Sequence, residues 1–222
     1  MTHFIVKPGL DIFMSITKPE YKGMKPNWSQ FLGWAILLGG LRGLDFYSTS
    51  LWFHQPGGYL DETNPLVSWF GIGKDWQVLW SINIALVILI LSAYWFYCFK
   101  YQPKAAPNEM RRSPLSLAKW QYYGRSVPTW QLLLNPPRRL RPAIAHLGFV
   151  AVRGLAIGSL LAGIHNLGQF YGWEVYSSFR EAVGRPNWVI YFLVVLSVWI
   201  SYRRVLKRDF EWVKNTRPMT TI

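Results

Sequence analysis

A charged pair lies in the middle of a segment that is otherwise composed to cross a membrane. The segment from Phe31 to Phe53 is apolar and exceeds the length that a membrane-spanning helix needs, yet it contains Arg42 and Asp45. An ionisable side chain at the centre of a bilayer costs roughly 3 kcal/mol on insertion scales. Such residues persist where they are paired, face a protein interior or serve a function. The sequence therefore indicates a membrane protein with a polar interior.

The distribution of apolar segments predicts four helices, at about 29–54, 77–99, 143–171 and 187–203. Of the 222 residues, 17% are aromatic, which suits a membrane protein with belts of Trp and Tyr at the bilayer interfaces. We therefore expect an all-α, polytopic fold with four transmembrane helices.

Basic residues alternate with the predicted helices. Most of the 24 Lys and Arg lie before residue 28, between 100 and 142, or after 202, whereas the other two connections contain more acidic than basic residues. The positive-inside rule then predicts that both termini are cytoplasmic. The net charge of +13 indicates topology and attraction to anionic lipid headgroups, and we do not expect nucleic-acid binding. We expect the inner membrane or another energy-transducing membrane.

These patterns divide the chain into five parts. We predict a basic, Pro-rich interfacial segment at 1–28, a first transmembrane hairpin at 29–99, a basic aromatic cytoplasmic connection at 100–142, a second hairpin at 143–206 and a cytoplasmic tail at 207–222. Short amphipathic pieces in the connection are typical of chain that lies at a membrane surface. We expect the connection to contact lipid or a partner.

The two hairpins share the spacing of some rare residues. Arg42 recurs as Arg153, each followed by Gly-Leu, and the same spacing relates His54 to His165. This pattern predicts an internal repeat. Because each unit has an even number of spans, the two repeats would be parallel, related by an axis along the membrane normal.

Small residues spaced by four predict that the first and third helices approach each other closely. Such ridges let two backbones pack in lipid. They are Ala35, Gly39 and Gly43 in the first helix, and Gly154, Gly158 and Ala162 in the third.

The charged residues of the first and third helices predict a shared polar network. Arg42, Asp45 and Thr49 lie on one side of the first helix. Asp45 is the only acidic residue in the four predicted spans, so we expect it to bridge Arg42 and Arg153. His146, two turns from Arg153 on the same face, would extend this interior. The network is either a structural bridge or a site for a ligand, an ion or a proton.

Two histidines supply an alternative interpretation. If the repeat is real, His54 and His165 occupy equivalent positions near the outer membrane surface and could ligate one b-type haem. The single cysteine, Cys98, excludes an internal disulfide and a Cys-based metal cluster. The sequence contains no nucleophile elbow, His-Glu-x-x-His pair or Walker-type glycine loop, so we expect no catalytic residues.

The chain after the first predicted helix carries a short motif, Asp45-x3-Thr49, then Gly58, then Glu62-x-Asn64-Pro65. This motif resembles that of a family of small, uncharacterised bacterial integral membrane proteins of unknown function. The resemblance implies a membrane fold in which these polar residues act together. Glu62 and Asn64 would then fold back over Thr49 and Asp45, or the segment is a simple turn that ends the helix.

These patterns favour a non-catalytic integral membrane protein. It would be an accessory subunit, or a binding protein for a lipid-like or anionic ligand or a membrane partner. One alternative is a b-type haem-binding electron carrier that uses His54 and His165. A third is a small transporter, which would have to form a homodimer to enclose a path.

Overall fold

The computed structural model describes residues 27–54, 76–184 and 186–216. Within these ranges the secondary structure is entirely helical, which confirms the all-α class. The elements are α1 (Trp28–Phe53), α3 (Trp76–Phe99), η2 (Asn108–Arg111), α4 (Pro114–Tyr123), α5 (Gln131–Leu134), α6 (Leu140–Phe170), α7 (Glu174–Val183) and α8 (Pro186–Thr216).

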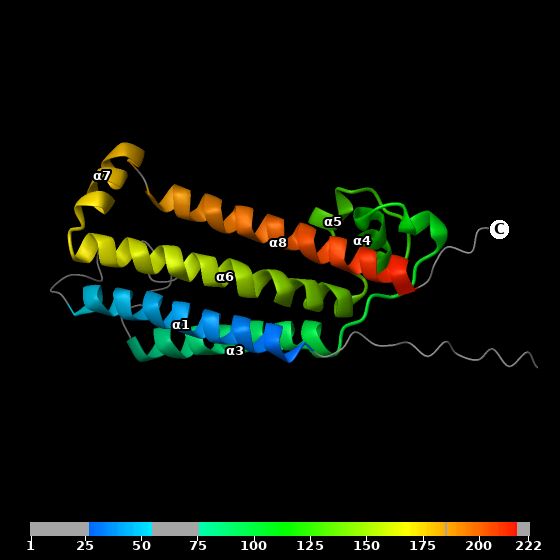
Figure 1. Ribbon diagram of the computed structural model, residues 1–222, viewed down its shortest axis with the longest axis horizontal. Coiled ribbons are helices and arrows are strands. Elements are labelled where there is room, and N and C mark those ends of the chain that lie inside the picture. The colour runs from blue at the N-terminus through cyan, green and yellow to red at the C-terminus, as the bar shows by residue number, and fades with distance from the viewer. Residues whose placement is uncertain (1–26, 55–75, 185, 217–222) are drawn as a thin grey trace, which may run out of the picture.

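Helix α6 is the centre of the structure. It contacts α1, α3 and α8, while α8 makes little contact with α1 or α3 (Figure 1). Helices α1 and α6 run in the same direction, and α3 and α8 run in the opposite one (Figure 1). The helices therefore form an open bundle in which α8 is joined to the α1–α3 pair mainly through α6.

Glycines on different sides of α6 explain its central place. A Cβ at Gly148 would lie 2.3 Å from the backbone carbonyl carbon of Ala93 in α3. A Cβ at Gly154 would lie 2.8 Å from Val198 of α8, and one at Gly163 would lie 3.1 Å from Leu44 of α1. Each neighbour can approach α6 closely because no side chain separates the helices.

The first and third predicted helices, α1 and α6, do pack closely as predicted, but not through the two small-residue ridges. The α6 ridge of Gly154 and Gly158 faces Val198 and Val194 of α8, not α1. Among the described residues, none lies near the glycines of the α1 ridge, since a Cβ at Gly39 or Gly43 would meet nothing within 4 Å. Residue spacing identified a helix-packing surface on α6 but not the helix that occupies it.

Three helices are long and apolar enough to cross a membrane: Gln77–Phe99, Leu140–Phe170 and Pro186–Asn215. Large apolar side chains on α3 and α8, such as Leu89, Phe192 and Val195, point away from the protein. This outward apolar surface is the pattern expected of helices in lipid. Helix α1, with its charged pair, does not meet the same criterion. The fourth span and the side on which each terminus lies stay predictions.

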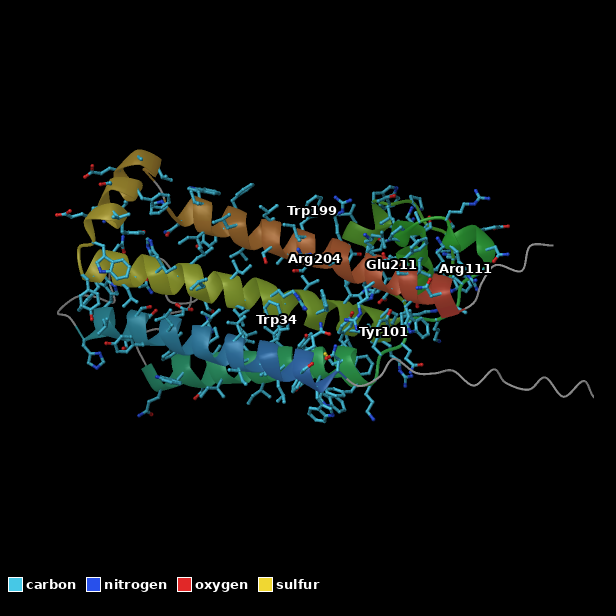
Figure 2. The ribbon with its side chains drawn as sticks, in the orientation of Figure 1. Trp34, Tyr101, Arg111, Trp199, Arg204 and Glu211 are labelled. Carbon is cyan, nitrogen blue, oxygen red and sulfur yellow. The ribbon has the colours of Figure 1, made fainter. Side chains whose placement is uncertain are left out.

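One end of the bundle is covered by a small helical assembly, called the cap here. It consists of η2, α4, α5 and residues 206–216 of α8 (Figure 1). Its two apolar clusters include Leu117 with Val213, and Ala118 with Leu206. Helix α8 thus continues well past residue 203, and part of the predicted 207–222 tail is packed helix. Figure 2 shows the side chain of Arg111 at this end, with Arg204 nearer the middle of α8.

The packing gives no support to the predicted repeat. Arg42 of α1 contacts Ser159, which lies six residues beyond Arg153 on α6. Residues related by an axis along the membrane normal would lie at the same depth, but Arg42 and Arg153 do not. In a repeat, the α6–α8 contact would correspond to the α1–α3 contact. It is far more extensive.

Candidate functional site

The charged pair of α1 is formed and is held by α6. Arg42 donates from Nη1 to Asp45 Oδ2 at 2.6 Å and to Ser159 Oγ at 3.2 Å. The side chains remain 18% and 15% exposed, respectively. A neutral pair one helical turn apart costs far less to place in a membrane than two separate charges. The predicted local pairing of these two residues is therefore present, and a serine of α6 orients it.

Hydrogen bonds extend this pair along the α1–α6 contact. Asn166 Nδ2 donates to Thr49 Oγ1 at 3.0 Å and to Ser48 Oγ at 3.3 Å, and Trp52 Nε1 donates to the Asn166 carbonyl at 3.3 Å. The hydroxyls of Ser48 and Thr49 donate in turn to the Asp45 carbonyl, both at 2.8 Å. The set forms what we call the α1–α6 ladder: Arg42, Asp45, Ser48, Thr49, Trp52, Ser159 and Asn166.

Arg153 is not part of the ladder, which corrects the expectation that Asp45 bridges both arginines. Asp45 lies beside Gly163 of α6. Gly163 is ten residues beyond Arg153, a separation of about 15 Å along the helix. Sequence spacing placed both arginines near the middle of apolar segments, but it did not fix the relative depth of the two helices.

An aromatic cage takes the place of a carboxylate at Arg153. Its guanidinium carbon lies 3.5 Å from the ring centre of Phe149, 4.4 Å from that of Trp34 and 5.6 Å from that of Tyr94. Its Nη1 also donates to the Phe149 carbonyl at 2.6 Å. Figure 2 shows Trp34 between α1 and α6. Ring faces and a carbonyl therefore stabilise this cation, so it does not require an anionic ligand.

A second polar site lies where the cap meets the bundle. Asp209 Oδ2 of α8 accepts from Tyr101 Oη at 2.7 Å and lies 2.8 Å from His146 Nε2 of α6. His146 Nδ1 lies 2.6 Å from Tyr122 Oη of α4. We call these four residues the Tyr-His-Asp cluster. His146, which the sequence placed in the Arg153 interior, belongs here instead.

Burial sets the chemistry of this cluster. His146 and Asp209 are each 2% exposed. Burial, with the Asp209 carboxylate nearby, raises the pKa of Tyr101 well above its usual value. Burial also raises the pKa of Tyr122, with Tyr202 and Asp209 as further causes. Both phenols therefore stay neutral. Both nitrogens of His146 have a hydrogen-bonding partner, Nε2 with Asp209 and Nδ1 with Tyr122.

This arrangement joins elements and does not activate a nucleophile. A nucleophilic oxygen needs a lowered pKa or a base with access to substrate, but both tyrosines are neutral and at least nine-tenths buried. The cluster links α8, α6, α4 and the second residue after α3 through three hydrogen bonds. Its evident role is to hold the cap against the bundle.

The two candidate haem ligands have separate hydrogen bonds. His54 is exposed at the end of α1, and its Nδ1 lies 2.6 Å from the Ser50 carbonyl. His165 Nδ1 is hydrogen-bonded to Tyr176 Oη of α7. Among the described residues, no group of three or more His, Cys, Asp or Glu could hold a metal ion. Haem binding by these two histidines stays a prediction.

Glu62 and Asn64 lie outside the described residues, so their predicted folding over Thr49 and Asp45 also stays a prediction. Comparison of the chain with protein-family models, curated proteins and solved structures finds no match. The candidate sites therefore depend on the geometry of this chain alone.

Proposed function

We propose that this chain is a non-catalytic integral membrane protein that serves as an accessory subunit, with a partner transmembrane helix packed against an open face of α1. The observation that carries the proposal is the glycine content of that face. Within the part of the chain that the structure describes, a Cβ added at Gly33, Gly39, Gly40 or Gly43 would meet nothing within 4 Å. We call these four glycines the open face of α1.

Contact with lipid alone would not offset the free-energy cost of these glycines to the helix. A glycine within a helix is about 1 kcal/mol less favourable than an alanine. In a membrane, glycine on a helix surface serves close contact with another helix, because it lets the two backbones approach. The α6 glycines each have such a neighbour within the chain. The open face of α1 therefore suits a neighbour from another chain.

The geometry of α1 limits the chemistry of that partner. The Arg42–Asp45 pair points toward α6, since Arg42 donates to Ser159 and Asp45 lies beside Gly163. The open face lies on the other side of α1, so a partner there would not contact the pair. The partner helix should carry small residues along the contact. In this proposal α1 is the fourth membrane-spanning helix and the basic cap is cytoplasmic, as the positive-inside rule predicts.

Photo-crosslinking in native membranes tests the proposal. A photoreactive residue in place of Gly40 should give one discrete protein adduct, and the same residue in place of Ala85 on the outward surface of α3 should give none. Adding Gly43→Leu to the Gly40 photoreactive variant should abolish the adduct, while the matched change Ala85→Leu should leave it intact.

Two outcomes would reject the proposal. The first is the absence of any protein adduct at position 40 in a variant that melts at the wild-type temperature. The second is an adduct with the mass of two copies of this chain, because the open face would then be a homodimer contact and not a site for an accessory partner.

A further inference from the structure

An open apolar groove of about 720 Å³ lies across the cap-proximal half of α3. Its lining comes from α3 itself, with one residue from α1 and one from α6. The residues that carry the argument are Ile88, Leu89, Ser92 and Trp95 of α3 and Ile144 of α6. Ile88 and Leu89 are more than half exposed, so the groove faces the surroundings of the protein and is not part of its core.

Positive charge lies at the cap-proximal end of this groove. Lys100 Nζ lies 5.7 Å from the centre of the Trp95 ring. Arg141 is exposed and comes three residues before Ile144 on α6, so it shares a side of the helix with that lining residue and lies nearer the cap. Helix α6 also begins here, and of the described residues no side chain caps its N-terminus, whose first amide groups add partial positive charge.

We infer that the groove binds an anionic phospholipid, with an acyl chain along α3 and the phosphate beside Lys100 and Arg141. The apolar walls match a hydrocarbon chain. The two cations and the start of α6 match a negative headgroup, and Trp95 lies at the level where the two parts of a phospholipid meet. This site is on a different surface from the open face of α1 and does not depend on the proposed partner.

Helix α8 provides a matched comparison. Arg203 lies 4.9 Å from the centre of the Trp199 ring, so it repeats the pairing of a cation with an exposed Trp. No residue of α8 lines the groove. If attraction between a headgroup and any exposed cation were sufficient, lipid would bind at Arg203 with the same affinity as at Lys100.

Native mass spectrometry of the full-length protein tests the site. The protein would be released from detergent micelles that contain either phosphatidylglycerol or phosphatidylcholine. We expect one phosphatidylglycerol to be retained per chain and phosphatidylcholine to be lost. Each basic residue near a headgroup contributes about fivefold to binding, so Lys100→Gln with Arg141→Gln should weaken retention about 25-fold. Arg203→Gln should leave retention unchanged.

A second variant separates the groove from the charge. Ser92→Trp fills the apolar groove while keeping both cations, and it should also abolish retention. Millimolar inorganic phosphate should not displace the bound lipid, because the acyl chain supplies part of the affinity. Wild-type retention of phosphatidylglycerol by the Lys100→Gln, Arg141→Gln protein, or equal retention of phosphatidylcholine by the wild type, would overturn the inference.

Discussion

The α1–α6 ladder and the Tyr-His-Asp cluster are both polar sites at helix contacts, but they are built in opposite ways. The ionic part of the ladder is local, since Arg42 and Asp45 are one turn apart on the same helix and remain partly exposed. The cluster joins residues that are far apart in the sequence and is almost fully buried. A local pair can form before the helices pack, whereas the cluster exists only in the complete fold.

This comparison indicates which of the two aspartates, Asp45 or Asp209, contributes more to the stability of the fold. Removing Asp45 leaves Arg42 with a hydrogen bond to Ser159 and some exposure. Removing Asp209 leaves His146 and Tyr101 without their shared acceptor at a site that water does not reach. The sequence pointed to Asp45 and not to Asp209, because Asp209 falls in the predicted tail. From the structure we expect Asp209 to matter more for stability.

The largest expected effect is therefore that of Asp209→Leu. Breaking a buried pair by removing one partner costs about 3–5 kcal/mol, because the remaining polar groups stay desolvated. We expect a large fall in the melting temperature in detergent and greater proteolysis within residues 101–139, which pack against this part of α8. A matched control is Glu211→Leu two residues later, where an exposed acid faces Lys207 at 3.8 Å. The control should change stability by less than about 0.5 kcal/mol.

Equal melting temperatures for these two variants would show that the Tyr-His-Asp cluster does not hold the cap in place.

A smaller effect is expected at Asp45, and double-mutant cycles show its origin. Asp45→Leu should cost about 2 kcal/mol, within the range for a hydrogen bond to a charged group. It should couple with Arg42→Leu by more than 1 kcal/mol, because the two side chains are in direct contact. Its coupling with Arg153→Leu should stay within about 0.5 kcal/mol, since the two sites are about 15 Å apart along the bundle.

Coupling of Asp45 to Arg153 as strong as its coupling to Arg42 would restore the single shared network that the sequence predicted, and would contradict the aromatic cage.

Local rules predicted the parts of these sites that a single helix determines. The turn-apart spacing of Arg42, Asp45 and Thr49 correctly placed them on one side of α1. Ser159 and Asn166 were missed as ladder members because a polar residue in an apolar segment does not reveal which neighbour it faces. The cage around Arg153 was missed for a similar reason, since aromatic residues are frequent here and only tertiary packing selects the three that surround the guanidinium.

Asp209 did carry a signal in the sequence. Val205, Leu206 and Val213 are apolar at helical spacing around it, and all three are buried. This periodicity predicts that the fourth helix continues past residue 203 with one buried face, and Asp209 lies on that face. The depth of α1 against α6 could not be predicted in the same way, because it depends on which glycines of α6 each neighbour contacts.

The smallest expected effect concerns alkaline pH and tests the burial of Tyr101. The folded pKa of Tyr101 lies well above its unfolded value of about 10, chiefly because of burial. Its contribution to stability is therefore fully present below pH 10 and is lost as pH rises toward the folded pKa. Tyr101→Phe has no such group, so the stability gap between wild type and variant should narrow by about 1 kcal/mol between pH 8 and pH 11. Urea unfolding in detergent at both values measures the gap. A constant gap for Tyr101→Phe would mean that its phenol is not buried beside Asp209 in the folded protein.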